Sequence, residues 1–178
     1  MFVQIKALPK ILTFSEAKYY VFSAVFASSA VFFPWLAHQF NMAGAQFLPM
    51  HFFVMFAGFL FGWRTGLLVG LLSPLMSYSI TQMPGMAILP EVTLELAVYG
   101  LAIGILRERN MNILASLTGA MLLGRLARWA FVLALGLQTN PLNYFKIGLP
   151  GIILQLALIP VVVYLLQKFV FKKDEGAV

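Results

Sequence analysis

Long apolar runs alternate with short polar or glycine-containing segments along most of the chain. A helix needs about 20 apolar residues to cross a bilayer, with about 17 as the short limit. Most of the runs reach or approach this length, and they lack the polar face of a surface helix in a soluble protein. The pattern predicts an all-α, polytopic membrane protein with one domain over residues 1–178. Its six transmembrane helices are expected at about 19–37, 49–61, 65–80, 89–106, 113–137 and 147–170.

The distribution of basic residues predicts the orientation. Six spans place both termini on the same side of the membrane, and loops rich in lysine and arginine stay cytoplasmic. On the side of the termini lie Lys6, Lys10, Arg64, Arg107, Arg109, Lys172 and Lys173, whereas Lys146 falls on the other side. We therefore expect both termini in the cytoplasm. The loops expected to face outward are 38–46, 81–87 and 138–144.

Composition agrees with a membrane protein and removes other classes. The chain is 61% hydrophobic and 10% charged, with a mean hydropathy of +0.90, whereas a soluble domain has about 25% charged residues. The formal charge of +6 is explained by orientation and by contact with lipid head groups of the bilayer, so no nucleic-acid partner is predicted. There is no cysteine, which excludes disulfides and thiol chemistry.

Four charged residues lie inside the predicted spans: Glu91 and Glu95 in the fourth, Arg125 and Arg128 in the fifth. Such residues are costly in a membrane and usually face the protein interior or a water-filled cavity. Glu95 and Arg125 lie at matched depth, roughly 18–20 Å from the turn between these helices at about 1.5 Å rise per residue. We predict that Glu95 pairs with Arg125 and Glu91 with Arg128. Each pair either fixes helix packing or contacts a ligand. The second role is favoured for Glu91 and Arg128, the outer pair, which lies one turn further from the turn between the helices.

Other polar and aromatic residues are expected near the same outer half. His51 opens the second helix, Asn143 and Tyr144 follow the fifth span, and Gln155 lies in the sixth. Trp129 offers a stacking surface beside Arg128. Each is either a packing residue or a ligand contact. The predicted substrate-binding set is Glu91, Glu95, Arg125, Arg128, Trp129, His51, Asn143, Tyr144 and Gln155.

Small residues recur on the first span: Ser23, Ala24, Ala27 and Ser28. Small side chains at four-residue spacing let another helix approach closely. The pattern indicates either packing inside the bundle or a docking face for a partner protein.

Motifs of catalysis are missing from the sequence. It contains no phosphate-binding loop, no G-x-S-x-G and no H-E-x-x-H. Its two histidines, His38 and His51, have no carboxylate at metal-ligand spacing. We therefore predict that the chain is not an enzyme and that it holds neither a metal nor a cofactor.

Several local patterns resemble one family. They are Leu48-Pro49-Met50-His51, the run AGFLFG at 57–62, GLLVGLLSP at 66–74, ELAVYG at 95–100, and Gly124-Arg125. Together with the length and six spans, this ordered set resembles the substrate-binding S component of energy-coupling factor (ECF) vitamin transporters. Family members typically present an AxxxA docking face, and this chain has serine in place of one alanine in Ser23-x-x-x-Ala27 and Ala24-x-x-x-Ser28.

The resemblance implies a membrane subunit of a prokaryotic cell that captures a vitamin from outside. It would dock through its first helix on a transmembrane coupling subunit that binds two ATPases. Two arginines offset by two glutamates indicate a zwitterionic or weakly anionic vitamin, and flavin or pyridoxine-type rings on Trp129 are an alternative. A different class stays open: a membrane scaffold or morphogenesis protein of the MreD-like kind, which would need neither matched buried charges nor polar outer loops.

Overall fold

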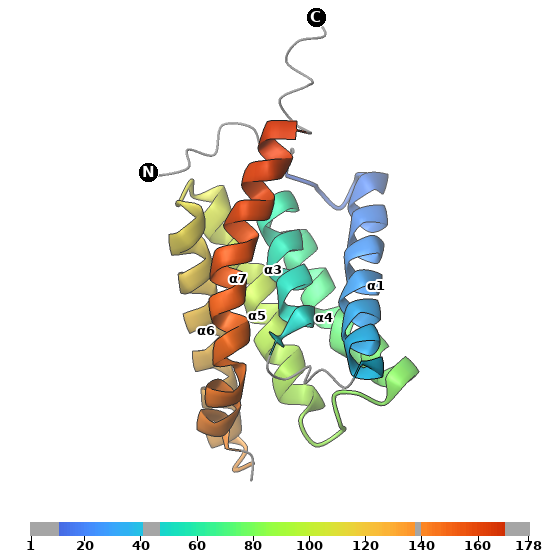
Figure 1. The fold of residues 1–178 in the computed structure, drawn as a ribbon, viewed down its shortest axis with the longest axis vertical. Helices are drawn as coiled ribbons and strands as arrows, with labels where there is room; N and C mark the ends of the chain where they lie inside the picture. The colour runs from blue at the N-terminus through green and yellow to red at the C-terminus, as the bar shows by residue number, and fades with distance from the viewer. Residues whose placement is uncertain (1–10, 41–46, 138–139, 170–178) are drawn as a thin grey trace, which may run out of the picture.

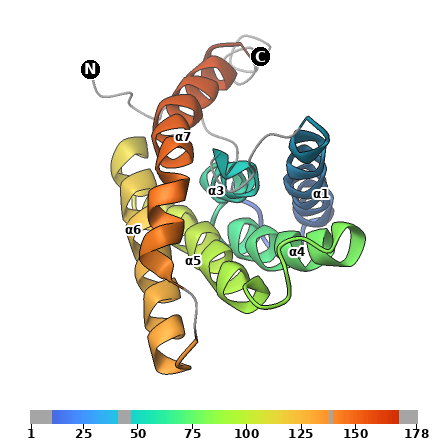
Figure 2. The ribbon, with the colours of Figure 1, turned by 60° about the horizontal axis from the view of Figure 1, so that its bottom comes forward.

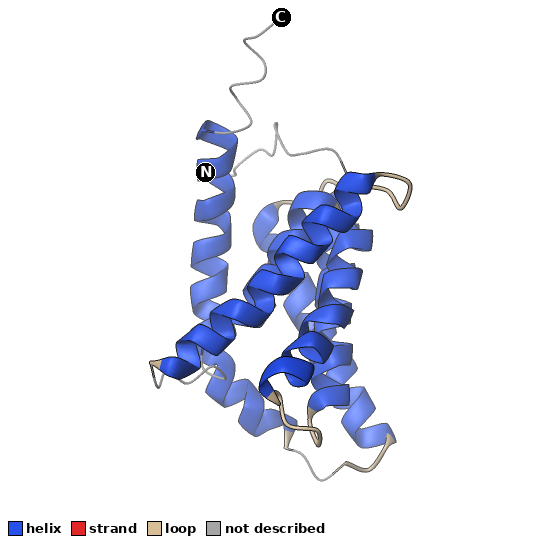
Figure 3. Ribbon diagram, turned by 90° about the vertical axis from the view of Figure 1, so that its right-hand side faces the viewer, coloured by secondary structure: helices blue, strands red, loops and turns tan. Residues whose placement is uncertain are grey.

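The computed structural model describes residues 11–40, 47–137 and 140–169, and within these ranges every regular element is an α-helix (Figure 3). The predicted spans match these helices to within two residues at every boundary except two. The fifth span ends at Ala134 instead of 137, and the last helix begins at Pro141 instead of 147, so Asn143 and Tyr144 are helical. The helices are α1 (Ala17–Gln39), α3 (Pro49–Phe61), α4 (Trp63–Thr81), α5 (Leu89–Glu108), α6 (Ile113–Ala134) and α7 (Pro141–Phe169).

Length and composition of the helices confirm a polytopic membrane protein. Four segments are long and apolar enough to cross a membrane: Ala17–Gln39, Leu89–Glu108, Ile113–Ala134 and Leu142–Lys168. α3 is apolar but has only 13 residues, and α4 has 19 residues that include three serines and two threonines. The two less typical spans are therefore consecutive helices joined at a single residue, Gly62.

Large apolar side chains cover the outside of the bundle. Val21 on α1, Leu122 on α6 and Ile153 on α7 each expose more than half of their surface. In water such a surface would be unfavourable, but against lipid tails it costs nothing. The exposed apolar surface is thus what a membrane-embedded protein requires.

Helix α5 occupies the centre of the bundle (Figures 1 and 2). It packs most extensively on α4 and α6 and also on α3, while α1 packs on α3 and α4 at one side. At the other side α7 contacts α6 and α3, and these contacts are far fewer than those of α5. The central helix is the one that carries both buried glutamates.

The two described ends of the chain lie at the same end of the bundle (Figure 1). There the amide of Leu12 donates to the Phe61 carbonyl at 3.0 Å, and the Trp63 amide donates to Glu108 Oε1 at 3.2 Å. These contacts join the start of α1 to the α3–α4 turn and to the end of α5. Arg64, Arg107 and Arg109 belong to this end, whereas Lys6, Lys10, Lys172 and Lys173 lie outside the described residues. Three of the basic residues from which the orientation was predicted therefore lie together at this end.

Glycines allow α3, α4 and α5 to approach one another in the half of the bundle nearest these turns. A Cβ atom on Gly66 would collide with the Gly100 carbonyl and lie 2.8 Å from the Cα of Gly58. A Cβ atom on Gly104 would collide with the Trp63 backbone. No side chain fits between the backbones at these positions, so the three helices are in direct backbone contact.

We expect Gly66→Ala to lower the thermal stability of the detergent-purified protein strongly, because the added methyl group must push the α4 and α5 backbones apart. Gly119→Ala is the matched control. It is also helical, but its Cβ would meet only the flexible end of Leu106, at 3.0 Å. Both substitutions gain about 1 kcal/mol in helix propensity, so the difference reports the packing alone. Equal melting temperatures for the two variants would show that the α4–α5 contact is not tight.

Candidate substrate-binding site

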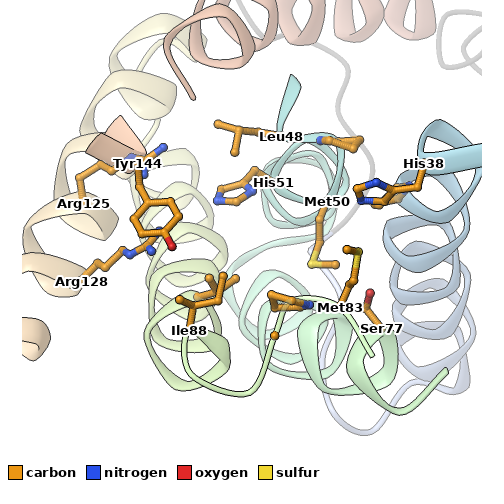
Figure 4. Close-up of a pocket in the computed structure, with 15 residues that line it drawn as sticks. His38, Leu48, Met50, His51, Ser77, Met83, Ile88, Arg125, Arg128 and Tyr144 are labelled. Atoms are coloured by element: carbon orange, nitrogen blue, oxygen red, sulfur yellow. The ribbon is translucent and has the colours of Figure 1, made fainter. Parts of the chain in front are cut away.

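A cavity of about 280 Å³ lies at the end of the bundle opposite the described termini (Figure 4). Its walls come from the six helices α1 and α3–α7 and from the segment that joins α4 to α5. Most of its lining is apolar, and Leu48, Met50 and Ile88 are examples. The polar lining residues are His38, His51, Ser77, Arg125, Arg128 and Tyr144. The size and the mostly apolar lining with few polar groups are typical of a small-molecule site.

Four charged side chains form one network at the wall of this cavity. Arg125 Nη1 lies 3.0 Å from Glu95 Oε1, and Arg128 Nε lies 2.9 Å from Glu91 Oε2, so both predicted pairs are confirmed. Arg128 Nη1 also contacts Glu95 Oε2 at 2.9 Å. The sequence did not indicate this third contact, which makes the two pairs a single unit.

The local sequence explains why the charges meet. Glu91 and Glu95 lie one turn apart on α5 and so share a face. On α6, Gly124 precedes Arg125 directly, and a Cβ at Gly124 would collide with the Tyr99 ring. Tyr99 therefore packs against α6 and donates its hydroxyl hydrogen to Glu95 Oε1 at 3.0 Å. The close approach of α5 and α6 at this glycine brings the carboxylates within reach of the guanidinium groups.

The cavity is lined by the arginines and not by the glutamates. Glu91 and Glu95 are fully buried, and neither carboxylate lines the cavity. The sequence favoured a ligand contact for the Glu91–Arg128 pair over the deeper Glu95–Arg125 pair. This division does not hold, because Arg128 bridges both glutamates while Arg125 and Arg128 both reach the cavity wall. The glutamates position the arginines.

Several buried polar atoms of the site have no hydrogen-bond partner among the described residues. They are Nε and Nη2 of Arg125, Nη2 of Arg128, both ring nitrogens of His51 and Oε1 of Glu91. His51 Nε2 lies 3.9 Å from Glu95 Oε1, which is too long for a hydrogen bond. A buried polar group without a partner costs about 1–3 kcal/mol, and more when it is charged. These atoms are therefore the positions of the site at which an added hydrogen-bonding group can bind.

Aromatic rings from the first turns of α7 lie against the arginines. The Arg128 guanidinium is 4.6 Å from the centre of the Tyr144 ring, and that of Arg125 is 5.9 Å from the Phe145 ring. Figure 4 shows Tyr144 beside both arginines. Sequence analysis missed Phe145, and its position next to Tyr144 at the start of an apolar helix gave no signal for this contact.

Trp129 was predicted as the stacking surface, but it does not line the cavity. It exposes 37% of its surface. Adjacent helical residues point about 100° apart, so Trp129 cannot share the inward direction of Arg128. Tyr144 occupies the stacking position instead.

Gln155 and Asn143 also lie away from the cavity wall. Gln155 is buried and its Nε2 donates to the Leu48 carbonyl at 2.9 Å. Leu48 has a left-handed backbone (φ 50°), which is uncommon for a residue other than glycine. The Asn143 side chain is exposed, and the backbone N–H of Asn143 donates to the backbone carbonyl of Asn140 at 3.1 Å. Gln155 thus fastens α7 to the start of α3, and Asn143 belongs to the first turn of α7.

Of the nine predicted site residues, four line the cavity: His51, Arg125, Arg128 and Tyr144. Sequence analysis missed the opposite wall, formed by Pro34, His38, Ser77 and the segment 83–85. No metal-ligating group of three or more residues occurs in the part of the chain that the structure describes.

The small residues of α1 divide between two faces. Ser23 and Ala27 each expose 1% of their surface and face the bundle, where α1 packs on α3 and α4. Ala24 and Ser28 are exposed. Of the two interpretations made from the sequence, internal packing applies to the first pair, and only the second pair is accessible to a partner.

The chain belongs to the family of ECF transporter substrate-specific components, whose family model matches residues 18–170. It is accordingly a membrane-embedded, substrate-binding transporter subunit. A search of curated proteins and a search of solved structures found no match.

We expect Glu95→Gln to destabilise the protein more than Glu91→Gln. Glu95 contacts Arg125, Arg128 and Tyr99, whereas among the described residues Glu91 pairs with Arg128 alone. Breaking a buried ion pair costs about 3–5 kcal/mol in soluble proteins, and less inside membranes because the unfolded reference also finds partners. The measurement is thermal unfolding in detergent.

The double variant Glu95→Gln with Arg125→Gln provides the control, because it removes opposite charges together and should recover part of the loss. If Glu91→Gln were as destabilising as Glu95→Gln, the central role of Glu95 in the network would be wrong.

Proposed function

We propose that this chain is the substrate-binding subunit of an ECF-type importer in the plasma membrane of a prokaryote. It captures a vitamin or related micronutrient from outside the cell. It delivers this substrate by docking on a transmembrane coupling subunit that binds two ATPases. The end with the basic turns faces the cytoplasm, and the cavity opens outward. The described helices act as one domain, and the bound molecule is released when the subunit reorients in the membrane.

The observation that carries this proposal is the cavity wall formed by Arg125 and Arg128. Both side chains are buried, yet each keeps guanidinium nitrogens without a partner among the described residues. If these ion pairs served helix packing alone, we would expect the carboxylates to accept hydrogen bonds from all the buried guanidinium nitrogens. A membrane scaffold of the MreD-like kind has no use for such a wall, so this feature favours the transporter subunit.

His51 provides a test of binding that leaves the ion network intact. We expect His51→Phe to keep or raise thermal stability, because the ring packing on Tyr99 (centroids 5.4 Å apart) is retained and two unpartnered nitrogens are removed. Substrate affinity should fall by up to about tenfold, the value of one neutral hydrogen bond.

The substrate for this measurement is the small molecule extracted from the purified wild-type protein and identified by mass spectrometry. Titration calorimetry then compares the two proteins. An unchanged affinity of His51→Phe would remove His51 from the site.

Docking through α1 is tested at Ala24, which is exposed, and not at Ala27, which is buried and whose enlargement would disturb the fold. We expect Ala24→Leu to abolish uptake in proteoliposomes that contain the complete transporter, with substrate affinity unchanged. Ala130→Leu is the matched control, because Ala130 is exposed on α6, away from α1 (Figure 2). Normal uptake by Ala24→Leu would exclude this face as the docking surface.

A further inference from the structure

The unpartnered donors at the cavity wall carry information about the substrate. We propose that the substrate is a small monoanion whose carboxylate binds between Arg125 and Arg128. This inference rests on the proposed function and specifies the chemical class of the molecule that the same cavity takes.

The hydrogen-bond inventory of the two arginines identifies the open positions. Arg128 uses Nε and Nη1 on the two glutamates, and its Nη2 has no partner among the described residues. Arg125 uses Nη1 on Glu95, and its Nε and Nη2 have none. All the open positions are donors, because a guanidinium has no acceptor. What the two arginines lack is an acceptor, and a carboxylate matches the fork of guanidinium N–H groups best.

The charges around the cavity argue against a cationic or zwitterionic molecule. Of the described residues that line it, none is a carboxylate, since Glu91 and Glu95 lie behind the arginines. A positive group in the cavity would therefore have no counterion within the described lining and would face two guanidinium groups. Charged groups at membrane depth are expensive unless they are paired.

The net charge of the four buried side chains argues against a doubly charged phosphate. The two glutamates and two arginines cancel, so each negative charge of the ligand is an excess charge near two buried carboxylates. A carboxylate adds one such charge and a phosphate monoester adds up to two. The network therefore favours the single charge.

The rest of the cavity limits the body of the molecule. Its volume of about 280 Å³ is small, at the lower limit of the roughly 300–1,000 Å³ typical of ligand pockets. Leu48, Met50, Met83, Ile88 and Val92 supply an apolar lining. The rings of Tyr144 and Phe145 lie against the guanidinium groups, and by limiting water they strengthen a charge-assisted hydrogen bond. A compact, largely apolar acid fits these limits.

The test uses a bacterial metabolite extract, separated on an anion exchanger at pH 7 into a bound and an unbound fraction. Portions of the bound fraction are treated either with carbodiimide and methylamine, which convert carboxylates to methylamides, or with alkaline phosphatase. Thermal unfolding of the purified wild-type protein is then measured with each sample. We expect the bound fraction to raise the melting temperature by roughly 5 °C. Amidation should abolish this shift, and phosphatase should leave it unchanged.

Three outcomes would overturn the proposal. A shift with the unbound fraction alone would show a neutral or cationic substrate and leave the proposed function standing. A shift that survives amidation but is lost on phosphatase treatment would identify a phosphate. No shift with either fraction would contradict both the substrate class and the proposed function.

Two variants test whether the rise in melting temperature comes from binding at Arg125. Arg125→Gln removes two open donor positions but only one described ion pair, so we expect it to lose the shift. Arg64→Gln is the control, because Arg64 lies at the opposite end, over the rings of Phe14 and Trp63, and should keep the shift. A full shift in Arg125→Gln would overturn the assignment. If this variant does not fold, the amidation result on the wild-type protein still decides whether the substrate binds through a carboxylate.

Discussion

The buried carboxylate of Glu95 is the group on which the arrangement of the bundle depends. Its oxygens lie within 3.0 Å of guanidinium nitrogens of Arg125 and Arg128 and of the Tyr99 hydroxyl, and the side chain is fully buried. A charge at membrane depth is tolerated only when it is compensated, so α5 and α6 can associate only in the register that brings these groups together. Gly124 makes that register sterically possible by admitting the Tyr99 ring. The network is therefore both a packing constraint and the support of the cavity wall.

The two halves of the bundle are built on different principles. Near the α3–α4 turn, Gly58, Gly66 and Gly100 bring backbones into direct contact, which leaves no room for side chains or ligand. Toward the other end the cavity forms beside His51. Tight backbone packing at one end thus holds together the helices α3, α4 and α5, which also contribute to the cavity at the other end.

The parts of the structure that could be predicted depend on constant helix geometry. The spans followed from apolar length, and the pairs Glu95–Arg125 and Glu91–Arg128 followed from counting a fixed rise along two antiparallel helices. Properties that depend on helix rotation were not accessible. The sequence did not tell that Ser23 faces inward while Ala24 faces outward, because both interpretations use the same spacing. Nor did it tell that Gln155 fastens α7 to Leu48, since that contact joins residues far apart in the chain.

Helix α7 has fewer contacts with the bundle than α5, yet it supplies much of what surrounds the arginines. Tyr144 and Phe145 lie against the guanidinium groups, a Cβ on Gly148 would lie 3.2 Å from Arg125 Nη2, and Gln155 holds the helix to α3. The unpartnered donors of the site thus lie next to its least packed helix. An acceptor that binds these donors contributes to the stability of the α6–α7 region as well as to its own affinity, because both depend on the same guanidinium groups. The proposed carboxylate site and the contacts of α7 with α6 therefore share Arg125 and Arg128.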